Sequence, residues 1–159
     1  MINKLTINIS TKTFGLELRS ANYEHLDLLR DWKNSQKEYF FHQKEISNIE
    51  QLRWFDSYIN RNDDYMFMVV YKNIFIGCMG IRLFDENWDI YNVILGLNEY
   101  GGKGFMGVAF EAMLQWAIER KKNPITLKVL KHNPAVSWYK KQGLIIVQSH
   151  DSYYSMKYN

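Results

Sequence analysis

The spacing of apolar residues along the chain predicts a mixed fold of strands and helices. Leu26, Leu29 and Trp32 recur at helical spacing and predict a helix over 23–33. A second helix is expected to begin at Ser47, where S-N-I-E fits a capping box. Further helices are expected after residue 107 and over 134–142, and strands over 16–19, 65–71, 74–84, 89–97, 125–129, 144–147 and 153–158. The order β-α-α-β-β-β-α-β-α-β-β predicts an α/β (α+β) fold.

Glycine is concentrated between the strand that ends at Leu97 and the helix that follows it. Gly101, Gly102, Gly104 and Gly107 account for four of the nine glycines in the chain. A glycine turn that leads directly into a helix leaves the first N–H groups of that helix without partners, beside the positive end of the helix dipole. Such a turn can bind an anion, most often phosphate. A tight strand-to-helix connection without any ligand is the alternative explanation.

Two common phosphate-binding patterns do not fit this loop. The pattern G-x-x-x-x-G-K-[ST] is absent, because no Gly-Lys-Ser or Gly-Lys-Thr occurs in the chain. The pattern G-x-G-x-x-G can be placed on Gly102, Gly104 and Gly107, but it should open the first βαβ unit and be followed by an acidic residue after the next strand. Here the loop comes late in the chain and Lys131 follows the next strand. A nicotinamide site is therefore not expected.

The loop and a second segment resemble the GNAT superfamily of acetyl-CoA-dependent N-acetyltransferases. The segment N-E-Y-G-G-K-G-F-M-G resembles motif A, whose loop reads [QR]-x-x-G-x-[GA], with Gly104 as the central glycine. Gly101 stands where Gln or Arg is usual, and Met106 where Gly or Ala is usual. The segment N-P-A-V-S-W-Y-K-K-Q-G-L, from Asn133 to Leu144, is similar to motif B. The two motifs occur in the expected order, and the resemblance extends from about Leu16 onward.

The resemblance implies the fold and the place of the acyl donor. It implies a single N-acetyltransferase domain over 1–159, with a mostly antiparallel sheet of about six to seven strands flanked by helices, and residues 1–15 as either an extra strand or a loose arm. Its two central strands would splay apart, and the pantetheine arm of acetyl-CoA would fill the gap, bonded to main chain near Leu95 and Leu97. The pyrophosphate would bind at Gly102, Lys103, Gly104, Phe105, Met106 and Gly107.

The resemblance also assigns catalytic roles for direct attack of the amine in a ternary complex. Tyr139 matches the tyrosine that acts as general acid toward the CoA thiolate, and packing beside Trp138 is the alternative explanation. Asn133 matches an asparagine that contacts the cofactor, and it can also cap the helix that follows. Asp89 lies near the carboxylate that some members use as base. A solvated turn carboxylate is the alternative explanation for Asp89, and Glu99 or an ordered water are the alternative bases.

For the acceptor, the N-terminal half resembles the ribosomal-protein-acetyltransferase-like branch. It is most similar to members that acetylate an amino group of a nucleotide-linked deoxy-amino sugar in surface-glycan synthesis. Acceptor contacts are expected from Phe40, Phe41, His42, Arg82 and Trp88, whereas Trp32, Trp54 and Phe55 are expected to be packing residues and His25 a surface residue of its helix. A protein N-terminus, a polyamine or an antibiotic remain alternative acceptors. A GNAT-fold protein that binds a ligand or partner without catalysis is a further alternative.

Composition limits the remaining functions. The net charge of +3 without a dense Lys/Arg run does not indicate a nucleic-acid-binding protein. The single cysteine, Cys78, excludes an internal disulfide, and no metal cluster is expected. The chain lacks both an apolar run of the ~20 residues that cross a membrane and a signal-peptide pattern at its N-terminus, so a cytoplasmic protein is expected. The family analogy also allows a homodimer.

Overall fold

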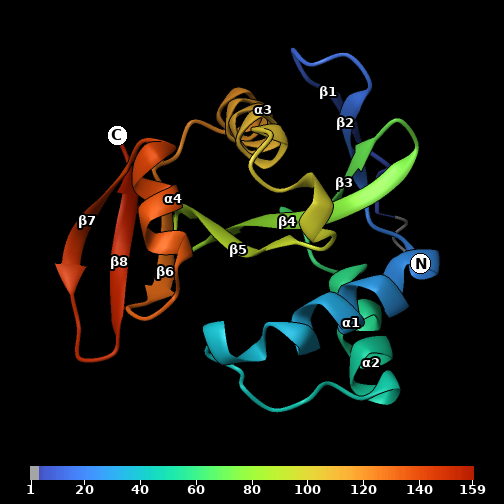
Figure 1. The fold of residues 1–159 in the computed structure, drawn as a ribbon, viewed down its shortest axis with the longest axis horizontal. Coiled ribbons are helices and arrows are strands. Elements are labelled where there is room, and N and C mark those ends of the chain that lie inside the picture. The colour runs from blue at the N-terminus through green and yellow to red at the C-terminus, as the bar shows by residue number, and fades with distance from the viewer. Residues whose placement is uncertain (1–3) are drawn as a thin grey trace.

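The computed structural model describes residues 4–159 and contains one eight-stranded sheet with helices on both faces (Figure 1). The strands are β1 (Asn8–Ser10), β2 (Leu16–Ser20), β3 (Asp64–Tyr71), β4 (Ile74–Phe84), β5 (Asn87–Leu95), β6 (Ile125–Leu130), β7 (Leu144–Ser149) and β8 (Tyr153–Tyr158). The helices are α1 (Leu26–Ser35), α2 (Asn48–Tyr58), α3 (Phe105–Arg120) and α4 (Ala135–Lys141), with 3-10 turns η1 (Tyr23–His25), η2 (Lys37–Tyr39) and η3 (Asn98–Tyr100).

The strand order is β1-β2-β3-β4-β5-β6-β8-β7, and only the β5–β6 pair is parallel. This arrangement confirms the expected mixed, mostly antiparallel α/β sheet. The count exceeds six to seven strands because Ile9 pairs with Leu18, which makes the N-terminal segment an extra edge strand. Residues 1–3 of the expected arm lie outside the described residues.

Strand β3 shows how the sheet separates two cores. Tyr65, Phe67 and Val69 belong to the cluster packed under α3 and α4, whereas Met66, Met68 and Val70 alternate with them and belong to the cluster under α1 and α2. All six are buried, as expected for a strand that is covered on both faces. Figure 1 shows α3 on one side of the sheet and the α1–α2 pair on the other. Both cores therefore hold the central strands in place.

Strand β5 contains a bulge at Asn92. Asn92 has a φ of 49° in the left-handed region, and the pairing with β4 shifts register between Cys78 and Gly80. Asparagine tolerates this conformation better than most residues. The extra residue inverts the alternation of the strand, so Ile90 packs in the α3 core and Ile94 in the α1–α2 core. The bulge thus reverses the face of the sheet to which the side chains after Asn92 point.

Strands β5 and β6 separate before β5 reaches the bulge at Asn92. Their parallel pairing is limited to Trp88 with Ile125 and Asp89 with Thr126. Beyond these two pairs the strands diverge, and side chains of both line an open cleft. The splayed central strands that the sequence resemblance implied are therefore present, and they position the candidate site.

His25 differs from its expected surface position. It is only 7% exposed, packs edge-on against Phe75 at 4.7 Å between ring centroids, and accepts a hydrogen bond at Nδ1 from the Asn22 N–H at 3.0 Å. Asn22 in turn accepts from the Glu24 N–H, so the two side chains form a reciprocal cap of the η1 turn. The prediction was wrong because helical periodicity does not reveal a histidine that serves as a cap.

Candidate active site

The glycine loop presents unpaired N–H groups at the start of α3. Gly102 and Gly104 have φ of 72° and 80°, and a Cβ added at either would meet nothing within 4 Å. The first hydrogen bond of the helix runs from the Val108 N–H to the Gly104 carbonyl at 3.0 Å. Within residues 4–159, the N–H groups of Phe105, Met106 and Gly107 have no acceptor. The loop thus has the open N–H groups that an anion site requires.

Side chains on the sheet side hold this loop in place. The Phe105 ring stacks on Tyr71 at 4.3 Å between centroids, and Tyr100 completes the aromatic cluster. The Met106 sulfur would lie only 3.0 Å from a Cβ at Gly77, so the methionine packs where β4 has no side chain. Phe105 and Met106 therefore offer a ligand their main chain. Lys103 is exposed at the rim, with Nζ 5.5 Å from the Tyr100 ring centroid.

The structure does not bring Leu95 and Leu97 to the cleft. The Leu97 N–H donates to the Ile76 carbonyl at 3.1 Å, and the Leu97 carbonyl accepts from the Tyr100 N–H at 3.0 Å. The Leu95 carbonyl accepts from Nε2 of Gln36 at 3.0 Å. The β5 wall of the cleft ends earlier, at Val93. Contacts of the main chain at these two leucines with the pantetheine arm stay a prediction from the sequence resemblance.

The cleft between β5 and β6 has a volume of about 1180 Å³. Tyr139 of α4 lines it, and within residues 4–159 its hydroxyl has no hydrogen-bond partner. Its ring is packed between Phe110 and Trp138, at centroid distances of 6.0 Å and 5.3 Å. Burial raises the pKa of Tyr139, so the phenol keeps its proton at neutral pH. The packing alternative and the acid role are thus compatible.

Asn133 serves as a cap at the edge of the cleft. Its Oδ1 accepts from the Ala135 N–H at 2.9 Å, and its Nδ2 donates to the Tyr39 carbonyl at 3.3 Å. The side chain also lines the cleft. The capping role that the sequence left open is present, and the cleft position leaves room for a ligand contact as well.

Asp89 lies on the floor of the cleft, where β5 and β6 are still paired. Its Oδ2 is 3.1 Å from Nε of Arg82. Burial raises the pKa of the Asp89 carboxyl, and the neighbouring Arg82 guanidinium opposes this shift. Glu99, by contrast, is exposed in the η3 turn and does not line the cleft.

Four of the five expected acceptor residues line the cleft, namely Phe40, Phe41, His42 and Arg82. Trp88 does not. It is 0% exposed in β5, and its indole N–H donates to the Lys121 carbonyl at 2.8 Å. The strand was expected to begin at Asp89, which left Trp88 in the loop before it, whereas the strand begins at Asn87. Trp88 is a core residue, and the prediction of an acceptor contact was wrong.

The segment after α1 crosses from the α1–α2 side to the β6–β8 side of the cleft (Figure 1). The Glu38 carbonyl lies 2.7 Å from Nε2 of His132, and the Phe41 ring contacts Tyr153 edge-on at 5.3 Å between centroids. With the bond from Asn133 to Tyr39, these contacts fasten the η2 turn to the far wall. The segment therefore bridges the two sides of the cleft.

Several polar residues of the site escaped the sequence reasoning. Tyr91 donates a short hydrogen bond to Oδ1 of Asp64, whose Oδ2 is 3.3 Å from Nη1 of Arg61. Burial, and then the Asp64 charge, raise the pKa of Tyr91 well above its ordinary value. These residues come from β3, β5 and the loop before β3, so no local motif links them. The buried Asp64, 2% exposed, carried no signal in the sequence.

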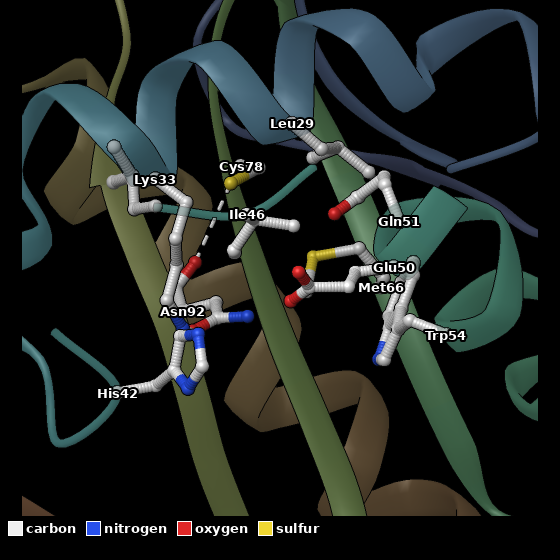
Figure 2. Close-up of a pocket in the computed structure, with 11 residues that line it drawn as sticks. Leu29, Lys33, His42, Ile46, Glu50, Gln51, Trp54, Met66, Cys78 and Asn92 are labelled. Carbon is white, nitrogen blue, oxygen red and sulfur yellow. Dashed lines mark hydrogen bonds between the residues drawn. The ribbon is translucent and has the colours of Figure 1, made fainter. Parts of the chain in front are cut away.

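A smaller pocket of about 260 Å³ adjoins the cleft beneath α1 and α2. Figure 2 shows Lys33, His42 and Asn92 at one end and Glu50, Gln51 and Trp54 at the other. The residues shared by the pocket and the cleft are Lys33, His42, Trp54 and Asn92. Trp54 was expected only to pack, and it does stack on Tyr58 at 4.9 Å, but it also lines both spaces.

Within residues 4–159 no helix is long and apolar enough to cross a bilayer. The same residues contain no cluster of three or more His, Cys, Asp or Glu side chains that could hold a metal ion. Cys78 is buried in the pocket floor, donates to the Asn92 carbonyl at 3.4 Å, and has a pKa raised by burial to about 12. The thiol is therefore protonated at neutral pH.

Comparison with protein families matches the acetyltransferase (GNAT) domain to residues 16–143. Among curated protein sequences, none matches this chain significantly. The matched span contains the glycine loop, Asp89, Asn133 and Tyr139.

Solved structures with the same fold include acetyltransferases for different acceptors. FdhC, a nucleotide-linked sugar GNAT, is 20% identical with a TM-score of 0.78, covering 96% of this chain and 90% of its own. RimL, a ribosomal L7/L12 α-N-protein acetyltransferase in complex with coenzyme A, is 15% identical with a TM-score of 0.75, covering 95% and 96%. Spermidine N-acetyltransferase from Vibrio cholerae, in complex with CoA and spermine, is 21% identical with a TM-score of 0.73, covering 91% and 94%. At these identities the similarity shows the fold.

Proposed function

Since the chain belongs to the GNAT acetyltransferase family, we propose that it acetylates an amino group of a nucleotide-linked deoxy-amino sugar by direct attack in a ternary complex. The observation that carries this proposal is the cleft between the splayed strands β5 and β6, which has Tyr139 on one wall and aromatic and arginine side chains on the acceptor side. An enzyme that transfers a group directly between two bound substrates needs a cleft in which both can meet.

The loop residues fit the diphosphate of acetyl-CoA, which supplies an acetyl group activated as a thioester. The N–H groups of Phe105, Met106 and Gly107 point out of the first turn of α3, and the positive end of the helix dipole favours a negative charge there. The open space around Gly102 and Gly104 lets a ligand approach the main chain closely. Lys103 adds a charge at the rim.

Tyr139 is suited to protonate a leaving thiolate. A phenol with a pKa of about 10 or above keeps its proton at pH 7, while a thiolate with a pKa of about 8.5 accepts one when it is hydrogen-bonded nearby. The Tyr139 hydroxyl has no partner within residues 4–159, and its ring is fixed by Phe110 and Trp138. The proton is therefore available at a defined place in the cleft.

Asp89 is the side chain best placed to take a proton from the acceptor ammonium. Its raised pKa increases its basicity relative to an exposed carboxylate, and the pairing with Arg82 keeps it oriented. Proton loss to a water in the cleft is the competing route.

The acceptor side supports a nucleotide-linked sugar in two ways. Arg61 and Arg82 both line the cleft and retain 42% and 39% exposure of their side chains, which suits contacts with phosphate oxygens. Phe41 and Phe84 also line it and are 56% and 69% exposed, which suits stacking against a flat base. The fold similarity to FdhC adds support.

The decisive experiment is calorimetric titration of acetyl-CoA against the wild-type chain and the Gly104→Glu variant. The new carboxylate would stand at the anion site, and φ of 80° disfavours any side chain, so we expect binding to be lost. Lys122→Glu, an exposed change away from the loop, controls for the added negative charge.

If acetyl-CoA binds, nucleoside-diphosphate-linked amino sugars are then tested as acceptors by the release of free thiol. A wild-type chain that does not bind acetyl-CoA, or binds it equally well after Gly104→Glu, would contradict the proposed donor site. Thiol release with polyamines or peptide N-termini, but not with amino-sugar nucleotides, would contradict the proposed acceptor.

A further inference from the structure

Lys33 lies where the large cleft and the smaller pocket meet. It projects from the last turn of α1 toward β5 and lines both spaces, together with Asn92 at the bulge (Figure 2). Its Nζ donates to Oδ1 of Asn92 and lies 4.4 Å from the centroid of the Phe40 ring. The ammonium is therefore enclosed by an amide and an aromatic face.

No carboxylate compensates this charge. Within residues 4–159, Lys33 forms no ion pair, and Asn92 is the only hydrogen-bond acceptor for its three N–H donors. Burial lowers the pKa of Lys33 to about 8, so even without a ligand the group is largely charged at neutral pH. A half-buried cation with unfilled donors is stabilised by an anion that enters beside it.

Of the other charged side chains that line the cleft, two arginines are paired with carboxylates, whereas Asp85 and Lys128 form no ion pair within residues 4–159. Arg82 is paired with Asp89 at 3.1 Å, and Arg61 with Asp64 at 3.3 Å. The cleft lining as a whole carries one positive charge in excess, with four cationic side chains against three carboxylates, namely Lys33, Arg61, Arg82 and Lys128 against Asp64, Asp85 and Asp89. A cationic acceptor would be repelled here, whereas an anionic one would complete the set of pairs.

The carboxylate that also borders the small pocket does not reverse this balance. Glu50 lies at the opposite end from Lys33 in Figure 2. Its Oε1 accepts from the Ser47 hydroxyl at 3.2 Å, while the Glu50 N–H donates to the same hydroxyl oxygen as part of the α2 cap. The exposed side chain remains bound to the start of α2, so the end of the pocket near Lys33 stays positive.

We propose that Lys33 is a specificity-determining residue that binds a phosphate or carboxylate oxygen of the acceptor, and that the acceptor must therefore be an anionic amine. The inference deepens the proposed function and rests on it. It predicts that nucleotide-linked amino sugars, or amino sugars that carry a carboxylate, bind productively, while polyamines do not.

The test measures binding of acceptor fragments that carry no amine, by calorimetry on the full chain. Uridine diphosphate and thymidine diphosphate probe phosphate, glucuronate probes carboxylate, and uridine and glucose are the neutral counterparts. The variants are Lys33→Met, Lys33→Arg and the control Lys44→Met, which removes an exposed lysine that lines neither space. Lys33→Met is expected to weaken anion binding by ~10- to 100-fold, as for loss of a charge-assisted hydrogen bond. Lys33→Arg retains part of the affinity.

Each result bears on the inference separately from the acetyl-CoA titration. If the wild type binds neutral and anionic fragments alike, or if Lys33→Met binds anions as the wild type does, the inference is overturned while the donor site stands. If Lys33→Met weakens acetyl-CoA as strongly as the fragments, Lys33 belongs to the donor site and the inference is also overturned. Should Lys33→Met fail to fold, the comparison of Lys33→Arg with Lys44→Met tests the inference. The ratio of the affinity for anionic fragments to that for neutral fragments is then expected to change in Lys33→Arg and to stay unchanged in Lys44→Met.

Discussion

Gly96 has a packing role that the phosphate-loop glycines do not share. It follows β5 directly, and its N–H donates to the Ile76 carbonyl at 2.8 Å. A Cβ at this position would lie 2.1 Å from Cε2, 2.4 Å from Cδ2 and 2.5 Å from Cζ2 of Trp32. Trp32 belongs to α1 and is only 7% exposed. The indole thus occupies the space that any side chain at Gly96 would need.

We expect Gly96→Ala to destabilise the protein strongly for a one-carbon change. Carbon atoms in ordinary van der Waals contact are about 3.5 Å apart, so the indole would have to withdraw by more than about 1 Å. The atoms that clash belong to the rigid ring, which cannot yield by a simple rotation. Overpacking of this kind costs about 1–3 kcal/mol, and about 2 kcal/mol lowers Tm by roughly 4–8 °C in a chain of this length.

Urea unfolding followed by fluorescence and calorimetry measures this change, with Gly101→Ala as the matched control. Gly101 has a φ of −74°, and its added Cβ would approach only the Asn98 carbonyl and a Leu95 methyl at 3.1 Å. The control should therefore lose less than about 1 kcal/mol.

The double variant Gly96→Ala/Trp32→Phe identifies the cause. The smaller ring should relieve the clash, so the two changes should couple by at least about 1 kcal/mol. Additive losses, or a loss for Gly96→Ala no larger than that for Gly101→Ala, would refute the steric argument.

Two further changes test the site chemistry and the cap. Tyr139→Phe should lower kcat by about 10²–10⁴-fold, as for loss of a general acid, while the acetyl-CoA affinity stays unchanged; an undiminished kcat would remove Tyr139 from the mechanism. Burial lowers the pKa of His25, and the neutral ring accepts from the Asn22 N–H, so its contribution to stability is present above the unfolded pKa of about 6.5 and is lost as pH falls through the lower folded-state value. His25→Gln, which keeps an acceptor, should make Tm less sensitive to acid than in the wild type, as measured by thermal unfolding from pH 7 to 5.

The sequence predicted the parts of the fold that depend on local patterns. Hydrophobic periodicity located the helices and strands, since covered faces repeat at fixed spacing. Glycine content located the loop before α3, where Gly102 and Gly104 do take positive φ. These features are encoded in consecutive residues.

What the sequence missed depends on contacts between distant segments. The bulge at Asn92 follows from one residue in a left-handed conformation, which an apolar run does not reveal. The bulged residue also contacts Lys33, which is 59 residues earlier in the chain. Trp88 was misplaced for a related reason, because the strand begins two residues earlier than expected, and this difference exchanges a loop position for a core position.

The departure from the motif A loop at Met106 is accommodated by the packing around this residue. A methionine at position 106 would crowd the first turn of α3 if it faced the ligand, where a small residue is usual. Its sulfur instead lies over Gly77, where a Cβ would come within 3.0 Å of it and 2.5 Å from the Ile94 carbonyl. The absence of a side chain at Gly77 thus opens the space that Met106 fills. Within residues 4–159 the main-chain N–H of Met106 has no acceptor, so the geometry that the proposed anion site requires is kept although its sequence signature is altered.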